Sequence, residues 1–449
     1  MARLGDTPLL TDLYELNMVQ AYLEHDVTDV AVFEFFVRSL PPGREFLVAA
    51  GLEQALDFLE DLHFSTSDLQ WLRNSNRFSD DLIGYLEGLR FTGDVHAIAE
   101  GTVFFPNEPI LRVTAPLPVA QLVETRLINI LHFQTLIATK AARYVLLAQG
   151  KQLVDFGLRR AHGAEAGLLA ARASYLAGFA GTATMLANQM YGVPLFGTMA
   201  HSFVEAFHDE VSAFQAFAES RPSQTVLLID TYDTEAAARK LVKLTQRLKE
   251  RGIIVRGVRL DSGDLIALSR SVREILDTGG LRDIGIFASG GIDEGVLAAI
   301  MQAKAPIDGF GIGTSLTTSS DAPGLDCAYK LQEYASLARR KRSPGKATWP
   351  GRKQVWRRYA ADGRMSGDTL SLESDRQIGE PLIKPVMKGG QRLDRPPLSE
   401  IRAATAKSLA SLPDEQRELR PGAQYPVAIG AALSSLTEEV DRRQDAAEG

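Results

Sequence analysis

The sequence predicts an α/β fold: residues 119–325 form an irregular TIM-like α/β barrel, and the N- and C-terminal segments form a second, α+β domain. Short apolar segments recur through the barrel region, and amphipathic helical patterns separate most of them. The expected strands are 152–156, 193–196, 225–229, 253–260, 284–288 and 309–312. The expected helices are 164–177, 234–251, 265–277 and 294–303. This alternation is typical of a parallel sheet with right-handed crossovers, and the number of units favours a closed or nearly closed barrel.

The flanking segments lack this alternation. Residues 1–118 mix helical patterns with strand-like ones: Val30–Val37 is rich in Val and Phe, and residues 92–118 are β-rich and punctuated by Pro and Gly. A long amphipathic helix is expected over 119–137, where the barrel region begins. Beyond residue 325 the alternation stops, and residues 326–449 are expected to complete the α+β domain.

Composition excludes several classes of protein. The 449 residues are 45% hydrophobic and 23% charged, which is ordinary for a globular chain. No apolar run approaches the roughly 20 residues that span a bilayer, and no signal-peptide core follows Met1, so we expect a cytoplasmic protein that does not bind a membrane. A single cysteine, Cys327, excludes an internal disulfide or a Cys-based zinc site. The net charge of −7 argues against nucleic acid as a partner, but a local cluster of Arg could still bind a small anion.

Polar residues and glycines collect directly after the predicted strands. The carboxyl ends of parallel strands meet at one rim of a barrel, where ligands and catalytic groups gather. In chain order the rim segments are Asp155–Arg160, Gly197–His201, Asp230–Asp233, Arg259–Asp264, Ser289–Gly291 and Gly311–Ser315.

The rim segments together fit a phosphorylated sugar. Each alone has a simpler interpretation as a turn, a helix N-cap or a surface ion pair. On consecutive strands, however, Ser289–Gly291 and Gly311–Ser315 offer backbone N–H groups that suit a phosphate monoester. Asp261 is placed to accept hydrogen bonds from sugar hydroxyls, and Arg159 and Arg259 offer paired donors to phosphate or carboxylate. His201 is a candidate for chemistry, although a lone histidine is more often structural.

In combination and order, these motifs resemble the nicotinate phosphoribosyltransferases over nearly the whole chain. The motifs that carry the resemblance are Thr11–Tyr14, Asp155–Arg160, Gly197–Ser202, Gly257–Asp264, Ser289–Gly291, Gly311–Thr314 and Pro350–Gln354.

The resemblance implies a reaction in which nicotinate attacks C1 of phosphoribosyl pyrophosphate, giving nicotinate mononucleotide and pyrophosphate. It also implies coupled ATP hydrolysis through phosphorylation of one histidine, which is His201 here, with Asp230 orienting the imidazole. Mg²⁺ is expected to assist mainly on the pyrophosphate oxygens, so a dedicated protein cage for the metal is not expected, and its ligands stay unassigned.

The resemblance also implies how nicotinate binds. Phe156 would stack on one face of the pyridine ring and Tyr14 on the other. Because Tyr14 lies far from the rim in sequence, it is expected to come from a second subunit, so a homodimer with shared active sites is implied. Arg259 and Thr198 would hold the nicotinate carboxylate.

The phosphoribosyl group has its own implied contacts. Asp261 would bind the ribose hydroxyls, and Arg159 would bind the 5′-phosphate. The loop residues expected to join Arg159 on the phosphate are Gly290, Gly291, Gly313 and Thr314.

Alternatives remain open at the level of the sequence. The related nicotinamide enzymes carry an Asp where this chain has Ala183, and an Asp there would repel a carboxylate, so Ala183 favours the acid over the amide. Nicotinamide phosphoribosyltransferase is the alternative within the class, and the quinolinate enzymes rank third. A non-catalytic protein that binds phosphoribosyl ligands is the alternative from another class. The basic segment 339–353 is either a solvated loop or part of the second domain near a neighbouring active site.

Overall fold

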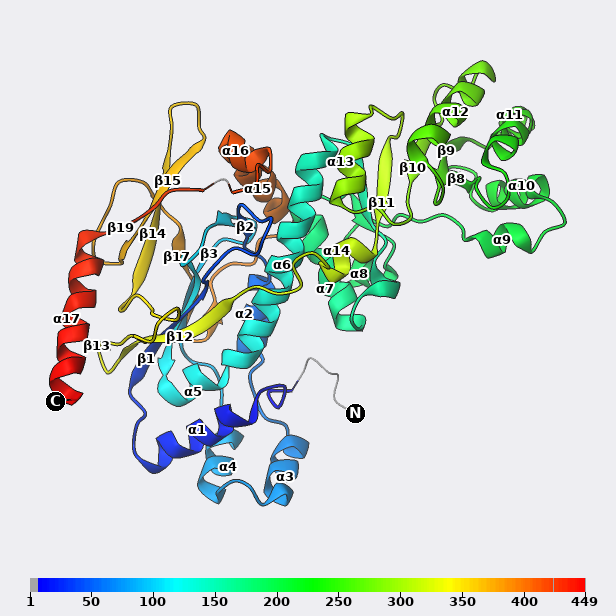
Figure 1. The fold of residues 1–449 in the computed structure, drawn as a ribbon. Helices are drawn as coiled ribbons and strands as arrows, with labels where there is room; N and C mark the ends of the chain where they lie inside the picture. Colours follow the sequence, from blue (N-terminus) through cyan, green and yellow to red (C-terminus); the bar gives the residue numbers. More distant parts are fainter. Residues whose placement is uncertain (1–6, 423, 449) are drawn as a thin grey trace. The chain divides into compact units, whose positions relative to one another are not determined.

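The computed structural model describes residues 7–422 and 424–448. These residues divide into two compact units (Figure 1). One comprises the described residues up to Thr139 together with those from Gly324 onward, and the other comprises Lys140–Pro323. The long helix α6 (Glu124–Ala148) runs through the first boundary.

The first unit is built on a seven-stranded antiparallel sheet in the order β13-β12-β1-β5-β3-β17-β18. Its strands are β1 (Val30–Val37), β3 (Asp94–Ile98), β5 (Pro109–Pro116), β12 (Cys327–Tyr334), β13 (Leu337–Ala338), β17 (Ile383–Lys388) and β18 (Gln391–Arg392). Strand β1 pairs with β5 on one side and with β12 on the other, so segments from both ends of the chain share one sheet. This arrangement confirms the α+β domain expected from the N- and C-terminal segments.

Smaller sheets and helices complete this unit. A four-stranded sheet contains β14 (Lys353–Tyr359), β15 (Met365–Leu372), β16 (Glu380–Pro381) and β19 (Val427–Ile429), and β2 (Leu47–Val48) pairs with β4 (Val103–Phe104). The helices are α1 (Leu13–Glu24), α2 (Leu52–Glu60), α3 (Thr66–Ser75), α4 (Asp80–Glu87), α5 (Leu117–Leu122), α15 (Leu398–Ala410), α16 (Asp414–Arg417) and α17 (Ala431–Glu448). Apolar residues of β1, β3, β5 and helices α1 to α5 form one buried core. The single helix expected over 119–137 is two helices, α5 and α6, which meet at Val123.

The second unit contains a parallel sheet of six strands in the order β7-β6-β11-β10-β9-β8. The strands are β6 (Gln152–Asp155), β7 (Gly181–Thr182), β8 (Thr225–Leu228), β9 (Val255–Leu260), β10 (Gly285–Ala288) and β11 (Gly309–Ile312). The helices are α7 (Ala164–Ala177), α8 (Met185–Tyr191), α9 (His201–Glu205), α10 (Glu210–Ser220), α11 (Thr234–Glu250), α12 (Leu265–Thr278), α13 (Glu294–Gln302) and α14 (Thr314–Thr318), with a 3₁₀ turn at Leu158–Arg160. The strand–helix alternation expected from the sequence is confirmed (Figure 1).

One predicted strand is wrong, and the barrel is not closed. Residues 193–196 make only an isolated parallel bridge between Leu195 and Thr182, while the unpredicted strand β7 pairs with β6. Pro194 has no N–H to give to a ladder, which limits pairing here. Because no pairing within the described residues joins β8 to β7, the sheet is a curled half-barrel.

Aspartates set the turns from strand to helix on three successive units of this sheet. Asp233 accepts a hydrogen bond from Ala236 N at 2.7 Å, and Asp293 accepts one from Val296 N at 2.8 Å. Asp264 accepts from the backbone N–H groups of the first turn of α12 at 3.0 Å. These N-caps satisfy orphan donors of α11, α12 and α13 and fix where each helix leaves the rim. Asp264, the last residue of the motif Asp261–Asp264, is therefore the N-cap of α12.

None of the helices formed by the described residues combines the length and apolar character needed to cross a bilayer.

Candidate active site

His201 begins helix α9 and is held by two neighbouring loops. Its Nδ1 lies 3.2 Å from the hydroxyl of Thr231, and its Nε2 lies 3.8 Å from Oδ2 of Asp261. The histidine side chain is 38% exposed, so a ligand can reach the ring. The hydroxyl at Nδ1 fixes the plane of the imidazole, and Nε2 faces the carboxylate.

Asp230 contacts the next strand loop instead of the histidine. Its Oδ2 accepts hydrogen bonds from Asp261 N and from the hydroxyl of Ser262, both at 2.8 Å. Its Oδ1 is buried, and no described residue donates a hydrogen bond to it. Asp230 therefore positions the loop that carries Asp261, whereas the sequence suggested that it orients the ring of His201.

Asp261 contacts the loop that follows the neighbouring strand β10. Its Oδ1 accepts a hydrogen bond from the hydroxyl of Ser289 at 2.5 Å. Gly290 has φ +88°, and a Cβ there would collide with the carbonyl oxygen of Asp261, so this close approach requires glycine. The structure thus brings His201, Asp261 and the Ser289–Gly291 loop together.

Arg259 and Thr198 meet at the carbonyl of Met199. Nη2 of Arg259 donates to this oxygen at 2.8 Å, and the hydroxyl of Thr198 donates to it at 3.4 Å. Nε of Arg259 is buried, and no acceptor for it exists among the described residues. Burial lowers the pKa of Arg259 and the charge of Arg159 lowers it further, whereas Asp261 and Asp230 act in the opposite direction. The guanidinium is held in place with donor capacity left over, as an anion site requires.

Phe156 packs against Gly311 of β11, where the absence of a side chain leaves room for its ring. Its backbone N–H donates to Ile312 O at 2.8 Å, and a Cβ on Gly311 would lie 2.5 Å from Cδ2 of the ring. Phe287 lies beside it, with 6.0 Å between ring centroids. Gly313 is next to the carbonyl oxygen of Phe156, so the predicted stacking residue and the predicted phosphate loop are adjacent.

Arg159 and Thr314 occupy two turns that pack on each other. Arg159 is exposed in the 3₁₀ turn Leu158–Arg160, and Thr314 begins α14. The side chain of Thr317 fills the space where a Cβ on Gly157 would be, and its hydroxyl lies 3.5 Å from Gly157 O.

Tyr14 lies in the other compact unit, on α1, and the residue is 44% exposed. Burial and nearby carboxylates raise the pKa of Tyr14 well above its ordinary value, so the phenol stays neutral at physiological pH.

The motif Pro350–Gln354 and the basic residues before it form ion pairs within the first unit. Lys353 Nζ is buried and pairs with Oε2 of Glu34 at 2.8 Å. Arg340 pairs with Asp441 at 3.0 Å, and Arg342 pairs with Asp445 at 2.5 Å. The basic segment 339–353 is thus tied to α17 and is not a free solvated loop.

The sequence missed the hydroxyl residues of the rim. Thr231, Ser262 and Ser289 each follow a strand end, and each binds a predicted site residue. The available signal was their position next to Asp230, Asp261 and Gly290 in the chain. Within the described residues, no three His, Cys, Asp or Glu side chains are grouped as metal ligands.

Family models match three parts of the chain: the nicotinate phosphoribosyltransferase N-terminal domain over residues 9–132, the nicotinate phosphoribosyltransferase family over 151–338, and the C-terminal domain over 375–437. The nicotinate phosphoribosyltransferase pncB2 of Mycobacterium tuberculosis is 50% identical over 424 residues, which cover 94% of this chain and 91% of that protein. The nicotinate phosphoribosyltransferase of Bacillus subtilis is 36% identical, with 94% and 92% covered.

Solved structures give the same result. The crystal structure of human nicotinic acid phosphoribosyltransferase superposes with a TM-score of 0.85 at 30% identity and covers 96% of this chain and 99% of its own. The nicotinate-nucleotide pyrophosphorylase of Pyrococcus furiosus superposes with a TM-score of 0.73 at 25% identity, with 92% and 97% covered. The match in sequence, fold and rim motifs shows that this chain belongs to the nicotinate phosphoribosyltransferase family.

Proposed function

We propose that the protein transfers the phosphoribosyl group of phosphoribosyl pyrophosphate to nicotinate, forming nicotinate mononucleotide and pyrophosphate in NAD salvage in the cytoplasm, with coupled ATP hydrolysis. One observation carries the proposal: His201, Arg259, Asp261 and the glycine loops lie on one rim of a chain that is 50% identical to a nicotinate phosphoribosyltransferase.

Nicotinate binds, on this proposal, between Phe156 and the guanidinium of Arg259. The ring of Phe156 offers an aromatic face for the pyridine. Arg259 and Thr198 receive the carboxylate, since Nε of Arg259 has no acceptor among the described residues. Ala183 is exposed after β7 and itself adds no negative charge here, which favours the acid over nicotinamide.

The phosphoribosyl group occupies the other half of the rim. Arg159 and the backbone N–H groups of the loops hold the 5′-phosphate, the loop residues being Gly290, Gly291, Gly313 and Thr314. The carboxylate of Asp261 accepts from the ribose hydroxyls and stabilises the positive charge that develops on the ribose as pyrophosphate departs. The pyridine nitrogen already has a lone pair, so positioning and charge stabilisation are the main sources of rate enhancement.

Bound together with the polyphosphate, Mg²⁺ would neutralise part of its charge. The residues of the rim fit this use: Asp230 has a buried carboxylate oxygen with no donor among the described residues, and Asp261 lies beside it. These two carboxylates would receive the hydration shell of the ion.

His201 couples ATP to the transfer in this proposal. Phosphorylation adds about −1.5 to −2 charges to the imidazole. This charge would lie close to Asp261, because Nε2 is 3.8 Å from that carboxylate. The phosphorylated and free enzymes would therefore differ in their affinity for anionic substrates and products, and that difference is what ATP hydrolysis can use.

Two copies of the chain are proposed to share their active sites, with Tyr14 of one copy stacking on nicotinate in the other. Helix α8 leaves Met185, Leu186 and Met190 exposed, an apolar patch of the kind that protein contacts cover.

One assay tests the function. The purified protein is incubated with nicotinate, phosphoribosyl pyrophosphate and Mg²⁺, with and without ATP, and the mononucleotide and pyrophosphate are quantified; a parallel reaction contains nicotinamide. We expect product from nicotinate and a higher yield with ATP. His201→Ala should keep a residual transfer that ATP does not stimulate. Binding of phosphoribosyl pyrophosphate without product, or a preference for nicotinamide, would contradict the proposal.

A further inference from the structure

The carboxylate of Asp155 is buried at the end of β6 and has no role in the proposed reaction. The residue is 0% exposed. Its side chain accepts a hydrogen bond from Gly157 N at 2.8 Å through Oδ1 and one from the hydroxyl of Thr182 at 2.7 Å through Oδ2. No cation of the described residues pairs with it. Two neutral donors compensate only part of the cost of burying a carboxylate, so this arrangement requires a reason beyond packing.

One of these bonds fixes the turn that carries Arg159. Gly157 opens the turn Leu158–Arg160, and its N–H would otherwise have no partner at the start of that turn. Thr317 closes the other side of Gly157, where a Cβ does not fit. The turn is therefore held by the hydrogen bond to Asp155 and by packing against Thr317 of α14.

The other bond fixes the loop that carries Ala183. The hydroxyl of Thr182 donates to Asp155 and accepts from Thr184 N at 3.0 Å. The backbone of Asp155 also binds this loop, because its carbonyl oxygen accepts a hydrogen bond from Ala183 N at 2.9 Å. The residues from Thr182 to Thr184 are thus locked to β6 as a unit.

We propose that Asp155 is a positioning residue that sets both halves of the site at once: the Arg159 turn on the phosphate side and the Thr182–Thr184 loop on the pyridine side. This inference rests on the proposed function for the meaning of the two halves. Asp155 does not itself touch a substrate and acts through the two loops that it holds.

The ionised carboxylate suits this task better than a neutral side chain. Asn would present an N–H to Thr182, whose oxygen already accepts from Thr184 N, so the hydroxyl proton would lose its acceptor. Protonation of Asp155 would have the same effect, because one of its two oxygens would become a donor and could no longer serve as an acceptor in the same way. The groups next to Asp155 are Gly157 N just after β6, the hydroxyl of Thr182 on β7 and, in the strand register, the apolar Ile312 on β11, and none of them is charged. Burial raises the pKa of Asp155 to about 6, and the two hydrogen bonds oppose that rise.

The test compares Thr182→Val, Thr182→Ser and Asp155→Asn in the full-length protein. Steady-state rates give KM for nicotinate and for phosphoribosyl pyrophosphate separately, and calorimetry gives the affinity for each without turnover. For Asp155→Asn we expect the affinity for nicotinate to fall about tenfold, because the hydroxyl of Thr182 loses its acceptor. The affinity for phosphoribosyl pyrophosphate should fall less, because the amide oxygen of Asn can still accept from Gly157 N. Thr182→Val should weaken nicotinate about tenfold and leave phosphoribosyl pyrophosphate within about twofold, and Thr182→Ser should restore wild-type values.

The pH profile separates positioning from a merely structural role. In the wild type, kcat/KM should fall below about pH 6 as Asp155 becomes protonated. That acid limb should be absent from Asp155→Asn, with the remaining activity flat through this range.

The outcomes distinguish the two proposals. An inactive wild type would overturn the proposed function, while calorimetry would still test the role of Asp155. An active wild type whose Asp155→Asn variant keeps both affinities and its acid limb would overturn the role of Asp155. If Asp155→Asn does not fold, the split between the two affinities in Thr182→Val decides, and an equal change in both would count against positioning.

Discussion

Hydroxyl groups at the rim orient the charged side chains. Thr231 lies at Nδ1 of His201, and Ser289 donates to Asp261. A neutral hydroxyl fixes the direction of an imidazole or carboxylate without adding charge, so the electrostatics of the site remain those of the carboxylates and arginines.

Thr231→Val should impair ATP coupling more than transfer. Valine keeps the size of threonine but cannot hydrogen-bond to Nδ1, so the ring of His201 would rotate away from the orientation that accepts a phosphoryl group. We expect ATP stimulation to fall about tenfold, with ATP-independent transfer unchanged within about twofold. The ratio of ATP hydrolysed to mononucleotide formed measures this, with Thr231→Ser as the matched control. An equal loss of both activities in Thr231→Val would mean that Thr231 supports the fold and not the coupling.

At the residue scale, the sequence predicted which residues lie near one another better than it predicted their contacts. Asp261 and Gly290 follow strand ends as the local patterns predicted, whereas His201 begins α9 after a segment that is not a strand, and the structure brings these residues together. The partner of His201 could not be predicted in this way. Asp230 and Thr231 are adjacent in the chain, and only the path of the loop decides which of them faces the ring.

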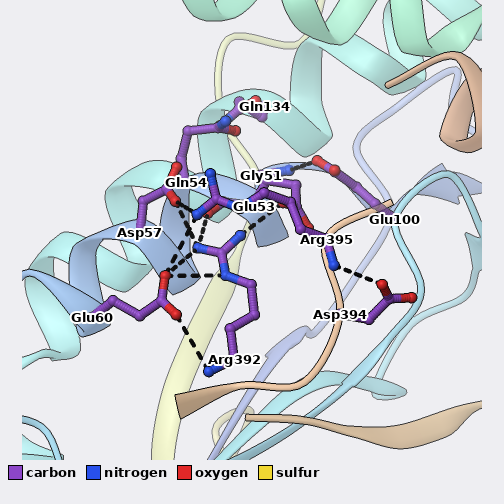
Figure 2. A network of polar contacts seen from close by, with 10 residues as sticks. All are labelled: Gly51, Glu53, Gln54, Asp57, Glu60, Glu100, Gln134, Arg392, Asp394 and Arg395. Carbon is purple, nitrogen blue, oxygen red and sulfur yellow. Dashed lines mark hydrogen bonds and ion pairs between the residues drawn. The ribbon is translucent and has the colours of Figure 1, made fainter. Parts of the chain in front are cut away.

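At the scale of elements, one arginine from the C-terminal segment anchors helix α2. Figure 2 shows Arg392 among carboxylates of this helix, which it contacts at 2.7 Å (Glu53), 2.6 Å (Asp57) and 3.0 Å (Glu60). Its side chain is only 5% exposed, whereas that of the adjacent Arg395, which also contacts Asp57, is 62% exposed. The buried arginine therefore carries most of the compensation for the three carboxylates.

Arg392→Ala should destabilise the protein much more than Arg395→Ala. Removing the buried cation leaves three carboxylates close together, and we expect a loss of about 3 kcal/mol in the free energy of unfolding. The exposed pair of Arg395 should cost about 0.5 kcal/mol. Urea denaturation followed by circular dichroism compares the two variants. Similar small effects would show that α2 is held by its apolar face alone.

Hydrophobic periodicity in the sequence predicted the bounds of some helices and strands correctly. Helix α7 coincides with the predicted 164–177 and β1 with the predicted Val30–Val37. Residues 193–196 are apolar enough for a strand, yet Pro194 and the competing two-residue strand β7 leave only the bridge at Leu195. Periodicity shows which residues are buried, but it does not show which neighbour they pair with.

A buried pair of carboxylates links α1 to the helices α5 and α6. The side-chain amide of Gln121 donates to Oε2 of Glu15 and to Oε2 of Glu124, each at 2.8 Å. Burial raises the pKa of Glu15 from 4.5 to about 7, the charge of Glu124 raises it further, and the bond from Gln121 opposes the rise.

Glu15→Gln should remove part of the pH dependence of stability. Between pH 4.5 and 7 the folded chain holds a proton that the unfolded chain releases, so stability is greatest at the acid end and is lost as pH rises through 7. The variant cannot ionise, and at pH 8 it should be more stable than the wild type by roughly 1–3 kcal/mol, a difference that should shrink as the pH is lowered toward 5. Melting temperatures measured from pH 5 to 8.5 test this; the exposed Glu24→Gln on the same helix is the control. Parallel curves for wild type and Glu15→Gln would show that Glu15 ionises normally.

At the scale of the whole molecule, the residues proposed for the site come from both compact units. The rim residues all lie within Lys140–Pro323, and Tyr14 lies in the unit formed from both ends of the chain. If Tyr14 of one copy completes the rim site of the other, as proposed, the active site forms only in the dimer.

Subunit complementation tests this assembly. Tyr14→Ala and Arg259→Ala chains with different affinity tags are co-expressed, and the heterodimer is purified through both tags. If Tyr14 acts in the partner's site, one site carries both substitutions and the other carries none, so activity should return to about half that of the wild type. The matched control pairs Arg259→Ala with Asp261→Ala, which lie in the same unit; each site then has one defect, and the heterodimer should stay inactive. The Tyr14→Ala homodimer must itself be inactive for half activity to count as complementation. A Tyr14/Arg259 heterodimer as inactive as the control pair would then mean that Tyr14 serves the site of its own chain.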